Sequence, residues 1–135
     1  MKIIDKVALA VFKDKKLLVV KAKKDTTTFI NLGGKREQGE SDIECLKREV
    51  KEEISCEIEH SSIQFIKEFI GPAHNFDKSV ILKMRLYTGN LIGEPIPSRE
   101  IAEIGFIDSN TNEKEVSEIG KTMILPYLKE KGYIN

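Results

Sequence analysis

Residues 31–56 read NLGGKREQGESDIECLKREVKEEISC, and this stretch decides the fold that we expect for the rest of the chain. It joins a glycine pair, a polar turn and an acid-rich segment. On a helix that turns about 100° per residue, its apolar positions fall on one stripe. These positions are Ile43, Leu46, Val50 and Ile54. The pattern predicts an amphipathic helix over residues 40–54 that packs against another layer.

Three carboxylates share one flank of this expected helix. Glu49, Glu52 and Glu53 are one, three and four positions apart, which places them within about 100° of one another. Like charges at such spacings destabilise a helix by about 0.2–0.5 kcal/mol per pair, so the cluster favours a bound cation. The alternative is a solvated helix face on which neighbouring basic residues balance the acids. Those residues are Lys47, Arg48 and Lys51.

The residues before the helix favour the functional interpretation. Gly33 and Gly34 allow positive φ or close approach of another backbone, and Gly39 lies just ahead of the helix. We therefore expect a glycine loop here. A helix that follows such a loop presents backbone N–H groups to anions.

These residues resemble the signature of the Nudix hydrolases. That signature is a glycine, five residues, Glu, seven residues, and then Arg-Glu-apolar-x-Glu-Glu-x-Gly-apolar. The chain has matching residues in this register at seven positions, namely Gly34, Glu40, Arg48, Glu49, Val50, Glu52 and Glu53. It departs from the pattern at Ser55, where the family has glycine, at Cys56, and at Asn31 and Leu32, where many members carry Leu-Pro.

The resemblance implies roles for the acidic cluster. The positions of Glu49 and Glu53 hold the principal ligands of a divalent metal, with Glu52 in support and the carbonyl of Gly34 as a further oxygen donor. The expected ion is Mg²⁺, or Mn²⁺ in its place. Mg²⁺ prefers hard oxygen ligands and is usually bound by a small number of protein carboxylates. Arg48 resembles the arginine that orients the neighbouring glutamates. Glu40 is expected behind it rather than as a ligand.

A general base must take a proton from the attacking water, and its position varies in this family. It is either a signature glutamate or an acid from a later loop. The later candidates are Glu100 and then Glu103, which precede a short expected strand. We favour Glu100, because turn-rich segments such as residues 93–99 place side chains at the edges of sheets. The alternative is that both acids are solvated.

Other residues are candidates for substrate binding. Lys35 and Arg36 follow the glycines and are expected to contact phosphate, unless they only balance nearby glutamates. Phe76, with His74 and Asn75 beside it, is expected to form a wall for the nonphosphate half of the substrate, although loop residues of this kind are often simply exposed.

Length and composition set limits on the whole protein. The 135 residues predict one domain over residues 1–135. The 22 basic and 22 acidic residues leave no net charge, so we expect no general attraction to nucleic acid. Cys45 and Cys56 fit no metal-ligand spacing, which favours reduced thiols in the cytoplasm. The N-terminal residues resemble neither a signal peptide nor a membrane span.

The remaining segments read as a scaffold of strands. Apolar or alternating patterns predict strands over residues 6–13, 16–23, 29–32, 56–59, 62–70, 79–88 and 103–107. Residues 25–28 are expected to break the pattern. A terminal helix is expected over residues 116–131, with Pro126 kinking or splitting it. Strands on both sides of a central helix predict a mixed β-sheet within an α/β/α sandwich, the architecture that the resemblance also implies.

The sequence thus predicts a divalent-metal-dependent Nudix hydrolase. We expect it to cleave a nucleoside diphosphate linked to another moiety by attack of water at phosphorus, with a housecleaning role in the nucleotide pool. Its partner is a small nucleotide derivative rather than nucleic acid or membrane, and a homodimer stays open. The alternative is a catalytically silent Nudix-like domain that binds a nucleotide or a protein.

Overall fold

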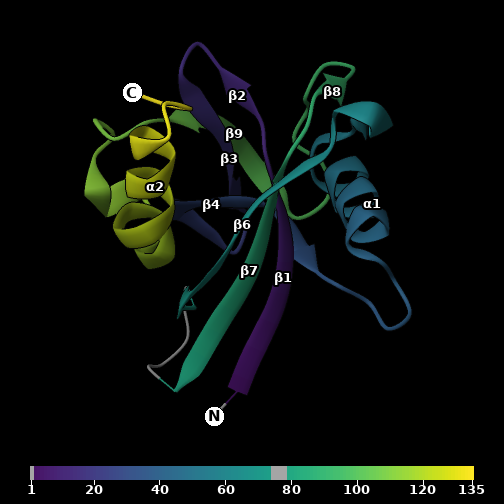
Figure 1. Ribbon diagram of the computed structural model, residues 1–135, viewed down its shortest axis with the longest axis horizontal. Helices are drawn as coiled ribbons and strands as arrows, with labels where there is room; N and C mark the ends of the chain where they lie inside the picture. The colour runs from purple at the N-terminus through teal and green to yellow at the C-terminus, as the bar shows by residue number, and fades with distance from the viewer. Residues whose placement is uncertain (1, 74–78) are drawn as a thin grey trace.

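The structure is a computed structural model that describes residues 2–73 and 79–135 (Figure 1). The strands are β1 (Lys2–Ala10), β2 (Phe12–Lys13), β3 (Lys16–Ala22), β4 (Asp25–Lys35), β5 (Glu57–Ile58), β6 (Gln64–Pro72), β7 (Val80–Thr88), β8 (Leu91–Ile92) and β9 (Ile101–Ile107). The helices are α1 (Asp42–Ile54) and α2 (Leu125–Glu130). Single helical turns lie at His60–Ser62, Glu113–Glu115 and Gly120–Ile124.

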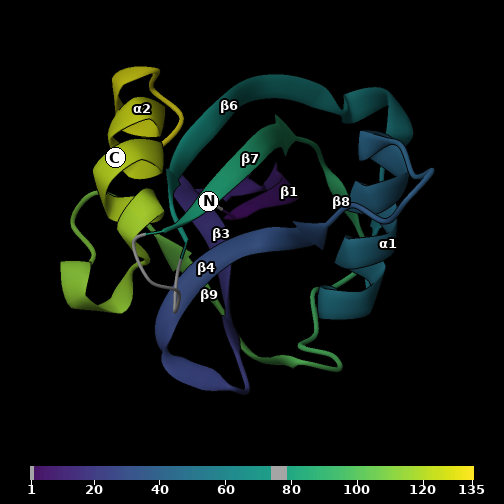
Figure 2. The ribbon, with the colours of Figure 1, turned by 90° about the horizontal axis from the view of Figure 1, so that it is seen from below.

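The main sheet contains parallel and antiparallel pairs, and its strand β4 pairs with β3 on one side and with β1 on the other. Its order is β2-β3-β4-β1-β7-β6, and β9 pairs with β3. β1 and β7 run parallel, whereas the other pairs in this sheet are antiparallel. The first part of β4 pairs with β3 and its end pairs with β1. Figure 2 shows β4 as a long curved strand whose end lies beside α1.

A helical layer covers each face of this sheet. Figure 1 shows α1 on one side and α2 on the other. The α1 side buries one apolar cluster, which includes Val7, Leu9, Leu18, Val20, Leu46, Val50 and Ile54. The α2 side buries a second cluster, which includes Ala8, Ala10, Leu17, Met84, Leu86, Ile124 and Leu128. The expected α/β/α sandwich with a mixed sheet is confirmed.

The glycine pair lies in a strand, and the prediction of a glycine loop was wrong. β4 begins at Asp25, within the polar cluster that we expected to break the pattern, and continues through Gly33 and Gly34 to Lys35. β-branched threonines favour strands, which accounts for the early start. At Gly33, where φ is 144°, a Cβ would overlap the carbonyl oxygen of Val7. Glycine therefore serves the close approach of β1 and β4.

Several other boundaries differ from the predicted ones. β1 starts at Lys2 and ends at Ala10, because its parallel register with β7 runs from Lys2–Val80 to Ala10–Thr88. β9 starts at Ile101 rather than at residue 103, and the short strand β8 is absent from the predicted strands. The expected terminal helix begins at residue 118 and is continuous to Glu130, because the π-helical turn Gly120–Ile124 runs directly into α2, and Pro126 stands in the first turn of α2.

α1 begins where its own residues cap it. The Ser41 hydroxyl accepts a hydrogen bond from the Glu44 N–H at 3.1 Å, and the Ser41 N–H donates to Glu44 Oε1 at 2.9 Å. This reciprocal pair satisfies two backbone donors at the helix start. Ile43 is only partly buried, and Cys45 joins the buried stripe with Leu46, Val50 and Ile54.

The start of α1 is fastened to the sheet by Asp42. Arg85 on β7 donates to both Asp42 oxygens, at 2.8 and 3.0 Å, and the Tyr87 hydroxyl donates to Oδ2 at 2.7 Å. The hydrogen bonds from Arg85 and Tyr87 lower the pKa of Asp42 despite partial burial. The carboxylate therefore stabilises the folded protein in its ionised form.

We expect Asp42→Asn to lower the free energy of unfolding by about 1–3 kcal/mol at pH 7, since it removes the carboxylate that accepts two hydrogen bonds from Arg85 and leaves Asp5, at 2.8 Å, as the nearest acid to that guanidinium. Tyr87→Phe removes one hydrogen bond and should cost about 1 kcal/mol. The pKa of Asp42 is lower in the folded protein, so its contribution is present above the unfolded pKa and disappears as the pH falls. Urea unfolding followed by circular dichroism tests this, and an equal loss for Asp42→Asn at pH 7 and pH 2 would contradict it.

Candidate active site

The acidic flank of α1 faces the glycine pair at the end of β4. A Cβ built on Gly34 would meet both oxygens of the Glu49 carboxylate at 2.5 Å, so a side chain at this position would displace the carboxylate. The Gly33 N–H donates to Glu53 Oε1 at 3.1 Å. The structure thus brings Gly34, Glu49 and Glu53 together, as the sequence predicted.

Arg48 links the signature acids. Its guanidinium donates to the two Glu40 oxygens at 2.7 and 2.9 Å, to Glu49 Oε1 at 2.8 Å and to the Lys35 carbonyl at 3.1 Å. Glu52 Oε2 lies farther away, at 3.4 Å. Hydrogen bonding to Arg48 lowers the pKa of Glu40 to about 2. Arg48 therefore spans the strand end and the helix, and it holds Glu40 ionised behind the cluster.

Glu53 occupies a less polar environment than the other signature acids. Burial raises the pKa of Glu53 to about 8, with a further increase from Glu49. Lys6 and the Gly33 N–H oppose this shift but do not cancel it. Two carboxylates this close repel one another when both are ionised, and a bound cation would relieve that repulsion.

A cleft of about 570 Å³ opens beside this pair. Its acids are Glu49, Glu53 and Glu100, and its basic residues are Lys6, Lys24 and Lys35. Aliphatic side chains of Ile4, Ile30, Leu82, Met84 and Ile119 line other parts of it. The described residues that line the cleft include no aromatic side chain. The cleft therefore has a charged part and an aliphatic part.

The two candidates for the later acid are separated by the start of β9. Glu100 directly precedes this strand and lines the cleft with Glu49 and Glu53. Glu103 lies within β9, opposite Lys21 of β3, and is exposed outside the cleft lining. The geometry thus favours Glu100, in the order of preference that we derived from the sequence.

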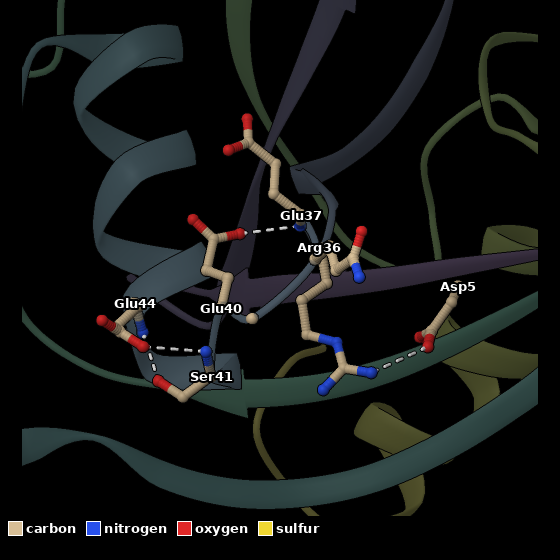
Figure 3. A pocket seen from close by; sticks show the side chains of 8 residues that line it. Asp5, Arg36, Glu37, Glu40, Ser41 and Glu44 are labelled. Atoms are coloured by element: carbon tan, nitrogen blue, oxygen red, sulfur yellow. Dashed lines mark hydrogen bonds and ion pairs between the residues drawn. The ribbon is translucent and has the colours of Figure 1, made fainter.

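Other predicted residues lie elsewhere. Glu52 is outside the cleft lining and is 3.6 Å from Arg99. Arg36 lies 3.7 Å from Asp5 and lines a second hollow of about 520 Å³ at the start of α1 (Figure 3). Phe76, His74 and Asn75 are outside the described residues.

The second hollow does not supply the anion site that we expected at the helix start. Figure 3 shows the Ser41–Glu44 cap within it, so those donors are already engaged. Acidic residues dominate its lining, with Arg36 as the basic residue. Its acids are Asp5, Glu37, Glu40 and Glu44. Their charge disfavours phosphate.

Sequence reasoning missed Lys6. This residue lies on β1 between Ile4 and Ala8, which belong to the α2-side cluster. Its ammonium donates to the Asn31 carbonyl at 3.0 Å, and the charges of Glu53 and Glu49 act on it. The available signal was a lysine that directly precedes the buried apolar run Val7 to Ala10 and shares a strand face with Ile4 and Ala8.

The helix that carries the acids ends as the family pattern requires. Ser55 adopts the left-handed conformation, with φ of 58° and ψ of 30°, and its N–H donates to the Lys51 carbonyl at 3.1 Å. Serine thus takes the conformation in which the resemblance leads us to expect glycine. Cys45 and Cys56 are free and buried. Burial raises the pKa of Cys45 to about 12.

The donor set suits a divalent cation, although the described residues contain no preformed group of three or more His, Cys, Asp or Glu side chains around one point. Glu49 and Glu53 supply hard oxygen atoms in the cleft, and Gly34 leaves space that a side chain would fill. Such ligands match Mg²⁺, which retains waters and binds few protein carboxylates.

An acidic helix held against a glycine pair by arginine, in an α/β/α sandwich, is the arrangement that the resemblance to the Nudix hydrolases leads us to expect. Residues 3–123 match the NUDIX domain, so the chain belongs to the Nudix hydrolases. This confirms the resemblance. Hydrolases of this family use divalent metal and act on small nucleotide derivatives.

Solved structures agree on the fold. A MutT NUDIX hydrolase from Burkholderia pseudomallei has 14% identity and a TM-score of 0.74, over 98% of this chain and 99% of that one. A UDP-X diphosphatase has 18% identity and a TM-score of 0.73, over 98% and 65% of the two chains. An ADP-ribose pyrophosphatase from Streptococcus suis has 21% identity and a TM-score of 0.60, over 89% and 83%. Comparison with curated proteins gives no match.

No helix among the described residues has the length and apolar character to cross a membrane.

Proposed function

We propose that the chain hydrolyses the diphosphate bond of a nucleoside diphosphate linked to another moiety, with Mg²⁺ or Mn²⁺ as the metal. The supporting observation is the cleft that joins Glu49, Glu53 and Glu100 with lysines and an aliphatic wall. Its charged part suits a diphosphate, and its aliphatic part suits the group attached to it. A cytoplasmic housecleaning role and a homodimer stay predictions.

Glu49 and Glu53 are the proposed principal metal ligands, with the Gly34 carbonyl and Glu52 as further oxygen donors. When bound, the ion neutralises charge on the phosphoryl oxygens and lowers the pKa of water. Arg48 positions Glu49 through the 2.8 Å hydrogen bond and is itself held by Glu40. Lys35 lines the cleft and is the proposed phosphate contact from the end of β4. Arg36 and Phe76 remain predicted substrate-binding residues.

Glu100 is the proposed general base. Its carboxylate takes the proton as water attacks phosphorus, while the lysines of the cleft attract the substrate's charge. The alternative is that a signature glutamate on α1 takes this proton. Glu100 directly precedes β9, so it reaches the cleft from a different element than α1, which carries Glu49 and Glu53.

We expect Glu100→Gln to lower kcat by about 10²-fold or more with little change in KM, because a general base acts in the chemical step. Glu103→Gln is the matched control and should stay within about threefold of the wild type. Steady-state kinetics measure both. A larger loss from Glu103→Gln than from Glu100→Gln would overturn the assignment.

A substrate panel tests the proposed function itself. Purified protein is incubated with Mg²⁺ or Mn²⁺ and with ADP-ribose, UDP-sugars, dinucleoside polyphosphates, capped RNA or nucleoside triphosphates, and the products are resolved by chromatography. We expect metal-dependent cleavage of at least one diphosphate bond. Nucleotide binding without turnover of any panel member would favour the catalytically silent domain instead.

A further inference from the structure

Lys6 stands at an unusual place in the sheet. It occupies the face of β1 that carries Ile4 and Ala8, both buried in the α2-side cluster. The register with β7 sets Lys6 beside Met84 and Ile4 beside Leu82, and all four residues line the cleft. An aliphatic side chain would continue this row at lower desolvation cost. A stability-only account therefore does not explain a lysine here.

The described neighbours of Lys6 accept a hydrogen bond from only one of the three N–H donors of its ammonium group. The Asn31 carbonyl accepts one hydrogen bond at 3.0 Å. Among the described residues no carboxylate lies within ion-pair distance of 4.0 Å, although Glu53 and Glu49 are near enough for their charges to act on it. An ammonium group has three N–H donors. Lys6 therefore keeps donor capacity on the cleft side of the strand.

The unused N–H donors of Lys6 lie in the charged part of the cleft. Lys6 adjoins Glu49 and Glu53, where the phosphates of a metal-bound substrate would lie, whereas Ile4 and Leu82 continue the lining toward the aliphatic part. A strongly hydrated point charge such as lysine suits a phosphate oxygen. Lys24, exposed in the turn after β3, adds positive charge to the same cleft.

We propose that Lys6 binds a nonbridging oxygen of the substrate's diphosphate and fixes where along the cleft the scissile bond lies. This inference rests on the proposed function. Lys6 holds the diphosphate from the sheet side while the α1 carboxylates act from the helix side. The substituent beyond the diphosphate then extends over Ile4 and Leu82.

A first experiment needs no substitution and no knowledge of the substrate. Wild-type protein is acetylated with limiting acetic anhydride in the presence of Mg²⁺, with and without inorganic pyrophosphate, and modification at each lysine is measured by mass spectrometry. We expect pyrophosphate to reduce labelling of Lys6 at least threefold, because a charge-assisted hydrogen bond engages its ammonium. Lys13, exposed on β2, is the internal control and should label equally in both samples. Equal labelling of Lys6 in both samples would overturn the proposal.

A second experiment separates substrate binding from a merely structural role. Lys6→Met should raise KM about 10- to 100-fold for the substrate that the panel identifies, and Lys6→Arg should restore most of the affinity. The Mg²⁺ concentration for half-maximal activity should stay within about threefold, and Lys13→Met should match the wild type. An altered Mg²⁺ requirement with unchanged KM would show that Lys6 only balances the glutamates and would overturn the proposal.

The two proposals fail in distinguishable ways. Wild-type protein that cleaves no panel member contradicts the proposed function, whatever happens at Lys6. Wild-type protein that turns over a substrate with the same KM after Lys6→Met contradicts the Lys6 assignment alone. Melting curves by circular dichroism accompany each variant, and the acetylation experiment decides the matter if Lys6→Met does not fold.

Discussion

Glu53→Gln is expected to lower kcat/KM by about 10²- to 10⁴-fold while the protein stays folded. The substitution keeps the size of a side chain that accepts the Gly33 N–H at 3.1 Å, so its position should persist. It removes the charge that a cleft cation requires, and metal-assisted charge stabilisation contributes several kcal/mol to such reactions. Steady-state kinetics over a range of Mg²⁺ concentrations, with a melting curve, measure both properties.

Glu57→Gln is the control for this experiment. Glu57 lies just beyond α1, is exposed and pairs with exposed Lys51 at 3.1 Å, so its loss should leave activity within about twofold of the wild type. Calorimetry adds a second readout, since Mn²⁺ should bind the wild type and bind Glu53→Gln more weakly. Undiminished turnover by Glu53→Gln would contradict the proposal that Glu53 is a metal ligand.

Arg48→Lys is expected to lower stability and activity together. Lysine cannot reproduce the forked hydrogen bonds to Glu40 or span Glu49 and the Lys35 carbonyl at the same time. We expect the free energy of unfolding to fall by about 1–3 kcal/mol at pH 7. We expect kcat/KM to fall about 10- to 100-fold, because Glu49 loses its fixed position. The chain has no tryptophan, so circular dichroism in urea is the suitable probe of unfolding.

The pH dependence gives this prediction a signature. Hydrogen bonding to Arg48 lowers the pKa of Glu40 from an ordinary 4.5 to about 2, so its stabilisation is present above pH 4.5 and is lost as the pH falls toward 2. The stability difference between wild type and Arg48→Lys should therefore narrow over that interval. Arg99→Lys, at an exposed residue, should show no such change. Equal stability of Arg48→Lys and wild type at pH 7 would contradict the assignment.

The sequence predicted local features well because local periodicity determines them. The stripe of Leu46, Val50 and Ile54 followed from helical spacing alone, and the buried row of β7 followed from alternation. The expected cluster of Gly34, Glu49 and Glu53 rested on the family signature and came together in the structure. Their chemical roles, and a single domain over residues 1–135, stay predictions.

Features that depend on distant segments could not be predicted in the same way. The glycines at 33 and 34 suggested a loop, because only the register of β1 against β4 reveals why a strand needs them. The partners of Lys6 are 25 residues away at Asn31, on another strand, and farther still at Glu53 on α1. Preference for Glu100 over Glu103 likewise required the start of β9 and the cleft beside it.

Cys45 gives α1 a built-in chemical reporter. Its thiol lies on the buried face of α1 and donates to the Gly34 carbonyl at 3.6 Å. Burial raises the pKa of this thiol to about 12. Alkylating reagents attack the thiolate, so the native thiol is protected by both its burial and its protonation. The rate of Cys45 alkylation under native conditions consequently measures how often the carboxylate-bearing helix separates from the strand end that it serves. Slower alkylation with metal or substrate bound would then report, without an added label, how strongly each ligand closes that contact.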